Sequence, residues 1–152
     1  VTTRLKREGE IEGKDYYFIS EEEFLKKIES NKFIEYAKVH DHYYGTLKDV
    51  VYKILNEGHD CLLEIDVQGA KNVKNNNENE SILIFIAPPD VETLCKRLYS
   101  RNKDSSKTIE HRIKNASKEL SEANFYNHYV INDDLENTIL KIQTILKESG
   151  IC

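Results

Sequence analysis

The apolar and polar residues of the chain follow two different periods. Apolar residues recur every three or four positions, the period of an amphipathic helix, in five stretches: 20–30, 50–58, 90–101, 109–120 and 135–146. Near-continuous apolar runs, typical of parallel strands covered on both faces, occupy 61–67 and 81–87, and a third short strand is expected at 128–133. Strands and helices that alternate in this order predict an α/β fold.

Local signals mark the ends of several elements. Ser20 can cap the first helix. Residues 33–46 are rich in β-branched and aromatic side chains around a polar Asp41-His42 pair, which predicts two short strands joined by a turn. Pro88-Pro89 is expected to stop the strand at 81–87. The polar tract NNNENE at 75–80 predicts a solvated loop.

Composition narrows the class of protein. A chain of 152 residues is the size of one ordinary domain. Its formal charge of −5 makes polymeric nucleic acid a poor candidate partner, so affinity for a phosphorylated ligand has to come from local clusters of arginine. The few cysteines are widely separated, which argues against disulfides and zinc and favours a reduced, cytoplasmic setting: Cys61, Cys95 and Cys152. Neither a signal peptide nor a membrane span is expected from the apolar pattern.

Two carboxylates, Glu64 and Asp66, alternate along the predicted strand at 61–67, so both are expected on one face. Gly69 follows just past the carboxyl end of that strand, the edge where ligands of open α/β sheets bind. The alternative is a pair of strand-end acids with local hydrogen bonds. A basic cluster elsewhere in the chain, which could pair with these acids, favours a functional site.

The opening stretch supplies that basic cluster. Arg4 and Arg7 can present forked donors to a phosphate, and the hydroxyl groups of Tyr16 and Tyr44 can add to them, although two arginines in such a place are more often simply solvated. Glu35 lies between apolar neighbours in FIEYA. It is either a functional carboxylate or the outward-facing residue of a half-buried strand.

A second basic group follows the middle of the chain. Arg97 and Arg101 share a helix face at i and i+4, and Arg112 follows the polar stretch SRNKDSS. They form either a solvated basic face or an arginine clamp that closes over transferring phosphates. His40 and His42 flank the predicted turn and are expected at the surface, so no protein metal site is predicted.

In combination these stretches resemble the guanylate kinase family, whose members transfer the γ-phosphoryl group of ATP to GMP. The resemblance covers essentially the whole chain and rests on motifs in the family's order: TTRLKREGEIEGKDYYF, FIEYAKVHDHYYGT, LLEIDVQGAKNV, FIAPP, the arginines around SRNKDSS, and VINDDL. It implies a P-loop kinase-like parallel sheet flanked by helices, with a mixed α/β insert that binds GMP and a small helical lid. The implied regions are 1–58 for GMP binding, 59–98 and 116–152 for the core, and 99–115 for the lid.

The resemblance also implies a role for each candidate residue. The contacts implied with GMP are Arg4, Arg7, Tyr16 and Tyr44 at the phosphate, Glu64 close to it, and Glu35, Thr46 and Asp66 at guanine. The contacts implied with ATP are Arg97, Arg101 and Arg112 at the phosphates and Asn132 near the adenine. Mg²⁺ would arrive with ATP, and no strong base is required, because positioning and charge neutralisation carry most of phosphoryl transfer.

One element of the family pattern is missing from the sequence. No G-x-x-x-x-G-K-[ST] motif occurs in it, and the first residue matches a position shortly after the family's phosphate-binding loop. We therefore expect these residues to be part of a longer protein and to be inactive alone, with the first strand of the fold absent. The alternative is a guanylate-kinase-like module that has lost catalysis and binds phosphopeptides. A kinase for another monophosphate is disfavoured by the guanine-reading pair Glu35 and Asp66.

Overall fold

The computed structural model describes residues 1–39, 41–76, 81–100 and 106–151, without the side chains of 106–112 and 117. The described chain forms two compact units, Val1–Ser81 and Ile82–Cys152, each with its own internal contacts. None of the described helices combines the length and the apolar character that crossing a membrane requires.

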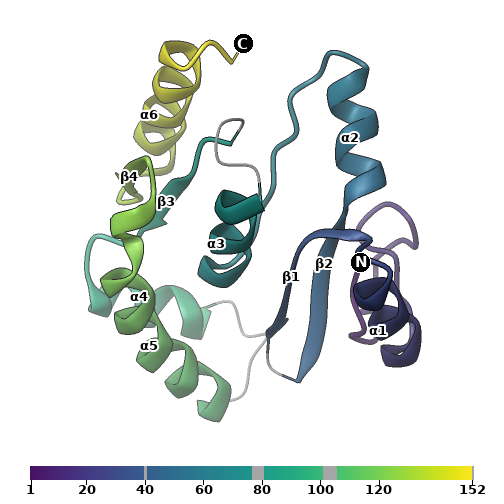
Figure 1. Ribbon diagram of the computed structural model, residues 1–152. Coiled ribbons are helices and arrows are strands. Elements are labelled where there is room, and N and C mark those ends of the chain that lie inside the picture. Colours follow the sequence, from purple (N-terminus) through teal and green to yellow (C-terminus); the bar gives the residue numbers. More distant parts are fainter. Residues whose placement is uncertain (40, 77–80, 101–105, 152) are drawn as a thin grey trace. The chain divides into compact units, whose positions relative to one another are not determined.

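The first unit is built around a β-hairpin (Figure 1). Its elements are α1 (Glu21–Glu29), β1 (Phe33–Val39), β2 (His42–Leu47), α2 (Lys48–Asn56) and α3 (Val67–Asn76). The two strands are antiparallel, and Asp41 takes a left-handed conformation with φ of 68° between them. The predicted pair of strands and the turn are therefore confirmed.

The opening residues lie along the other edge of β2. Thr2 bridges Tyr44 of β2 and, on its other side, Phe18. Its side chain is 0% exposed, and its hydroxyl donates to the carbonyl oxygen of Tyr43 at 2.9 Å. This pairing fixes the chain immediately before Arg4 against the hairpin.

Helix α1 covers one face of the hairpin. The predicted cap is confirmed, because the Ser20 hydroxyl accepts a hydrogen bond from the backbone N–H of Glu23 at 3.1 Å. Phe24 is 0% exposed and stacks on Phe33 and Tyr43, with ring centroids 4.4 and 5.1 Å away. These rings form the core between α1 and the hairpin.

An irregularity in the register of β1 decides where Glu35 points. Phe33 pairs with Leu47 and Glu35 pairs with Thr46, so one extra residue lies on β1 between these two pairs. In a regular strand Phe33 and Glu35 would share a face, because they are two residues apart. The bulge instead leaves Phe33 on the α1 side and turns Glu35 toward α3, which packs against β1.

The second unit combines a short parallel sheet with helices. Its elements are β3 (Ile84–Ala87), α4 (Val91–Ser100), α5 (Ser106–Ser121), the 3₁₀ helix η1 (Ala123–Phe125), β4 (His128–Ile131) and α6 (Leu135–Glu148). Strands β3 and β4 pair in parallel, and the rings of Phe85 and Tyr129 stack at 5.5 Å. The predicted strands at 81–87 and 128–133 and the three predicted helices of this half are confirmed within a few residues.

The predicted strand at 61–67 is wrong. Residues 61–66 are not in a strand, Val67 already belongs to α3, and Leu62 is 91% exposed. A strand requires a hydrogen-bonded neighbour, and no described segment pairs with this one. The predicted loop at 75–80 is also partly wrong, because α3 continues through Asn75 and Asn76, while 77–80 lie outside the described residues.

Candidate functional site

Three predicted site residues meet on the α3 side of the hairpin and, with Gly69, form what we call the carboxylate cluster: Glu35, Thr46, Asp66 and Gly69. Thr46 pairs with Glu35 across the hairpin and donates its hydroxyl hydrogen to Glu35 Oε1 at 2.6 Å. The backbone N–H of Gly69 donates to Asp66 Oδ1 at 2.8 Å. A Cβ atom placed on Gly69 would lie 2.7 Å from Glu35 Oε2 and 3.3 Å from Asp66 Oδ1, so both carboxylates border this glycine.

Glu35 is the buried member of the cluster. It is 5% exposed, which rules out the outward-facing alternative for this residue. Burial raises the pKa of its carboxyl group, the hydrogen bond from Thr46 opposes this shift, and the negative charge of Asp66 adds to it. Asp66 itself is exposed. A buried carboxylate beside an exposed one suits a ligand edge that offers several N–H donors.

The second group, which we call the arginine cluster, lies where the opening stretch meets β2: Arg4, Glu10, Tyr16 and Tyr44. Arg4 Nη2 donates to Glu10 Oε1 at 2.7 Å and Nη1 donates to Oε2 at 3.0 Å, a bidentate pair. The Arg4 guanidinium lies 5.5 Å from the centre of the Tyr16 ring, whose centroid is 6.1 Å from that of Tyr44. Three of the four residues predicted at the phosphate, Arg4, Tyr16 and Tyr44, are thus together.

The ion pair of the arginine cluster shifts the pKa of both of its partners. The side chains of Arg4 and Glu10 are only 11% and 19% exposed. The hydrogen bonds from Arg4, together with one from the backbone of Arg7, lower the pKa of Glu10 to about 2. The pKa of Arg4 is raised, chiefly by Glu10 and further by a hydrogen bond with Tyr44, while burial opposes the rise.

Arg7, the fourth residue predicted at the phosphate, is attached to the same cluster through its backbone. Its N–H donates to Glu10 Oε2 at 2.7 Å, and its side chain is exposed. The guanidinium of Arg7 acts on Glu10 through its charge. The structure therefore presents one arginine held in the cluster and one at its surface.

Strand β2 connects the two clusters. Tyr44 and Thr46 are two residues apart on β2, so their side chains lie on one face, about 7 Å apart along the strand. Both clusters belong to the first unit. The structure thus places carboxylate acceptors and guanidinium and hydroxyl donors along one face of β2.

Glu64 lies just before α3, in the segment predicted as a strand. It is exposed in the extended segment at 61–66, as is Asp66. The expectation that both acids lie in a buried strand is therefore wrong, since that segment forms no strand. Asp66 still reaches the carboxylate cluster because it immediately precedes α3 and accepts from the N–H of Gly69.

In the second unit Arg97 is engaged with the backbone. Its Nη1 donates to the carbonyl oxygen of Asn132 at 2.8 Å and its Nη2 to that of Asp133 at 3.0 Å. Asn132 in turn accepts at Oδ1 from the Thr138 hydroxyl at 3.4 Å. Arg97 and Asn132, both predicted near ATP, therefore lie side by side at the carboxyl end of β4.

Some predicted residues lie wholly or partly outside the described part of the chain. Arg101 and His40 lie outside the described residues, and Arg112 belongs to α5 with its side chain outside the description. His42, predicted at the surface, is the first residue of β2 and is partly exposed.

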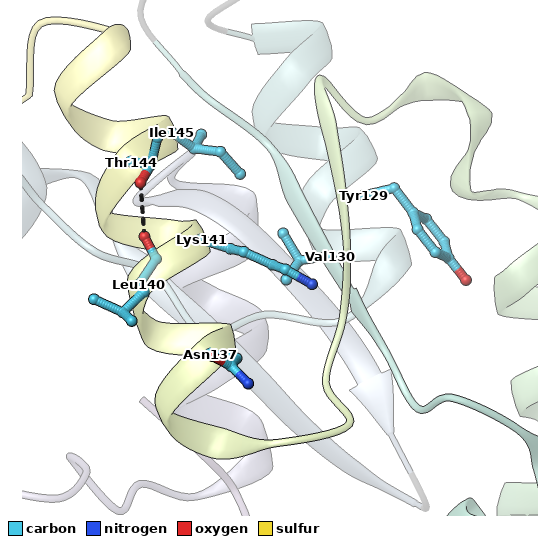
Figure 2. A pocket seen from close by; sticks show the side chains of 7 residues that line it. All are labelled: Tyr129, Val130, Asn137, Leu140, Lys141, Thr144 and Ile145. Carbon is cyan, nitrogen blue, oxygen red and sulfur yellow. Dashed lines mark hydrogen bonds between the residues drawn. The ribbon is translucent and has the colours of Figure 1, made fainter.

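An open hollow of about 660 Å³ lies between β4 and α6 in the second unit (Figure 2). Lys141 extends from α6 toward Val130 of β4, and Thr144 donates its hydroxyl hydrogen to the carbonyl oxygen of Leu140. No predicted site residue lines this hollow. The candidate site is therefore the pair of clusters on the hairpin.

Sequence reasoning gave no role to two residues of the site. In the sequence, Glu10 is one of several charged residues with no distinguishing feature, whereas in the structure it contacts both arginines of the opening stretch. Gly69 was noted for its place after an expected strand, whereas its role is to let the Glu35 carboxylate approach α3. The signal available for both was their position inside motifs, G-E after the arginines and D-V-Q-G.

Known proteins are similar to this chain in sequence and in fold. The family model described as guanylate kinase matches residues 1–149. Guanylate kinase of Caldanaerobacter subterraneus subsp. tengcongensis is 49% identical over 145 residues, covering 95% of this chain and 70% of that protein. Guanylate kinase of Rickettsia prowazekii is 47% identical over 146 residues, covering 96% and 74%.

The fold of this chain is also similar to that of a solved structure. The crystal structure of guanylate kinase from Anaplasma phagocytophilum superposes with a TM-score of 0.82 at 35% identity, covering 97% of this chain and 72% of that one. The fold class expected from the sequence, a P-loop kinase-like α/β fold, is confirmed by this match. A match of the family model over nearly the whole chain, with relatives this similar, shows that the chain belongs to the guanylate kinase family.

Proposed function

We propose that the protein is an ATP:GMP phosphotransferase that converts GMP to GDP, and that its GMP site consists of the carboxylate cluster and the arginine cluster. The observation that carries the proposal is the contact of Glu35 with Thr46 and Gly69, beside Asp66, on the same hairpin face as Tyr44 of the arginine cluster. The relatives named guanylate kinase support the reaction class.

The carboxylate cluster has the chemistry to read guanine. Guanine offers two adjacent donors, the N1–H and the 2-amino group, and one carboxylate can accept from both. Adenine has no N1–H and no 2-amino group, so it would leave a buried carboxylate unpaired. Glu35 is buried and already oriented by Thr46, and Asp66 supplies a second acceptor.

The arginine cluster has the chemistry to bind the phosphate. A phosphate dianion accepts forked N–H donors and hydroxyl donors, which Arg4, Tyr16 and Tyr44 bring together and Arg7 can complete. Glu64 would lie close to this phosphate. Because a base and a phosphate are separated by a ribose in every nucleotide, the spacing of the two clusters along β2 suits one nucleotide across both.

The ATP side of the proposal follows from the family. Arg97, Arg101 and Arg112 would neutralise charge on the transferring phosphoryl group, and Asn132 would lie near the adenine. Arg97 is held by two backbone carbonyls, so it would act from a fixed position. The regions 1–58, 59–98, 99–115 and 116–152 and the cytoplasmic location remain predictions.

Magnesium would be a component of the ATP complex. The described residues contain no group of three or more His, Cys, Asp or Glu side chains able to hold a metal ion. Mg²⁺ usually binds phosphates and water, so it would be held through the ATP phosphates. When bound, the ion would neutralise phosphate charge.

Calorimetric titration with GMP and AMP tests the proposal directly. We expect GMP to bind at least about tenfold more tightly, because each unmade hydrogen bond to a buried charged group costs about 1–3 kcal/mol. Equal affinity for the two nucleotides would refute the guanine assignment. Binding of a phosphopeptide without any binding of GMP would identify a recognition module instead of a kinase.

A further inference from the structure

The carboxylate of Glu10 organises both arginines of the opening stretch. Its Oε1 accepts from Arg4 at 2.7 Å, and its Oε2 accepts from Arg4 at 3.0 Å and from the backbone N–H of Arg7 at 2.7 Å. The backbone N–H of Glu10 donates back to the carbonyl oxygen of Arg7 at 3.2 Å. These contacts close a turn over residues 7–10, which the left-handed φ of 84° at Gly9 permits.

The same contacts determine which part of Arg4 faces a ligand. Glu10 takes one N–H of Nη1 and one of Nη2, and the carbonyl oxygen of Leu5 takes the other N–H of Nη1 at 2.7 Å. A guanidinium has five N–H groups, and the two that neither Glu10 nor Leu5 takes, on Nε and Nη2, share one edge. The Tyr44 hydroxyl also hydrogen-bonds Arg4, and its own O–H together with that edge forms a set of donors that a phosphate can accept from.

We propose that Glu10 is a positioning residue for the nucleotide phosphate: it holds Arg4 with its Nε–Nη2 edge available and fixes the turn that presents Arg7. This inference rests on the proposed function, because the phosphate is that of the proposed GMP substrate. Glu10 acts through the two arginines and does not itself touch the substrate.

The charge of Glu10 also has an opposing effect on phosphate binding. The negative charge of Glu10 partly cancels the positive charge that attracts the phosphate, so its removal could in principle strengthen binding. Yet Arg4 is enclosed, 5.5 Å from the Tyr16 ring centre and 5.7 Å from that of Phe18, and without Glu10 two of its N–H groups lose their acceptor. The guanidinium would then have to reorient and the turn at Arg7 would loosen. We expect this lost preorganisation to outweigh the gain from the removal of one negative charge.

The test compares GMP with guanosine, which has the same base and ribose and no phosphate. Calorimetric titration of the unmodified chain and of the Glu10→Gln variant gives the ratio of their affinities. We expect Glu10→Gln to lower the preference for GMP over guanosine about tenfold while guanosine binding stays unchanged. Glu12→Gln is the matched control, because Glu12 belongs to the same stretch but accepts from the N–H of Phe18 at 3.2 Å; its ratio should not change.

A double-mutant cycle with Arg4→Ala shows whether Glu10 acts through Arg4. In that background Glu10→Gln should change the ratio by clearly less, and full additivity would overturn the positioning role. An unchanged or increased preference for GMP in Glu10→Gln alone would overturn it as well. If Glu10→Gln no longer binds guanosine, the variant has lost its fold, and Glu10→Asp replaces it in the test. Aspartate keeps the charge but is too short to reach both arginines, so it should also lower the preference for GMP over guanosine. No preference for GMP in the unmodified chain would instead refute the proposed phosphate site.

Discussion

Replacement of Gly69 by alanine should affect the stability of the chain and its proposed recognition of guanine to different extents. Gly69 lies in the first turn of α3 with an ordinary helical backbone, so alanine meets no conformational strain there. The new Cβ would lie 2.7 Å from Glu35 Oε2, closer than Cβ atoms come to non-bonded heavy atoms, and 3.2 Å from the Cβ of Ile65. The atom that has to move is the end of the Glu35 side chain.

The magnitudes predict a small effect on folding and a larger one on binding. Alanine gains up to about 1 kcal/mol over glycine within a helix. Displacement of the Glu35 carboxylate strains or breaks its 2.6 Å hydrogen bond with Thr46, which contributes about 1 kcal/mol. These terms nearly cancel. Loss of charge-assisted hydrogen bonds to guanine costs about 1–3 kcal/mol, so GMP affinity should fall roughly tenfold or more.

Urea unfolding and calorimetric titration with GMP measure the two effects separately. Gln68→Ala is the matched control, because Gln68 is exposed in the same turn of α3 and should change neither quantity appreciably. If Gly69→Ala stabilised the chain and left GMP affinity unchanged, Glu35 would not be the residue that reads the base.

Three further predictions test other parts of the structure. Glu35→Gln should stabilise the fold at neutral pH, because burial raises the pKa of this carboxyl from its usual 4.5. This gain in stability should vanish as the pH falls below 4.5, which urea unfolding at several pH values will show. The same variant should weaken GMP binding by about 1–3 kcal/mol. Phe24→Ala should cost about 3–5 kcal/mol in urea unfolding, because its ring is 0% exposed between Phe33 and Tyr43; a cost below 1 kcal/mol would contradict that packing. The pKa of Glu10 is lowered to about 2, so its ion pair stabilises the fold fully above pH 4.5 and is lost as the pH falls toward 2; acid titration should show a steeper loss of stability in this range for the unmodified chain than for Glu10→Gln.

Elements that depend on neighbouring residues could be predicted from the sequence. The cap at Ser20, the helix that follows it and the hairpin around Asp41 are specified within short windows, and each is present. The helical periodicity at 135–146 is also correct. Its apolar stripe, however, is not a buried face within the described residues, because Leu135 and Ile139 are 65% and 45% exposed. Periodicity predicts a helix, but it does not identify what covers the helix.

The segment at 61–66 shows the same limit for strands. Its side chains do alternate as the sequence indicates, with Leu62, Glu64 and Asp66 exposed and Cys61, Leu63 and Ile65 half-buried. Alternation arises from an extended backbone, whereas a strand also requires a partner for its N–H and C=O groups. The side-chain pattern of a sequence indicates an extended backbone, but it does not indicate whether another strand pairs with it.

The side of the hairpin to which Glu35 points depends on a β-bulge, which the pattern of apolar and polar residues does not show. Counted by alternation, Phe33 and Glu35 belong to the same face of β1, and an outward-facing glutamate was a reasonable alternative. One extra residue between the pairs Phe33–Leu47 and Glu35–Thr46 sends them to opposite faces. The bulge satisfies both, because Phe33 joins the aromatic core with Phe24 while Glu35 reaches Gly69.

The two clusters of the site differ in how they are held, and this difference predicts how each responds to mutation. The carboxylate cluster joins β1, β2 and the start of α3, so its geometry follows the packing of three elements. The arginine cluster is held by a turn over residues 7–10 and by one carboxylate that binds both arginines. A loop has few other contacts to keep it in place, and the loss of a single side chain therefore disturbs it more. Substitutions at Glu10 should consequently act mainly on phosphate affinity, with a smaller effect on global stability, whereas substitutions in the packed elements should change both.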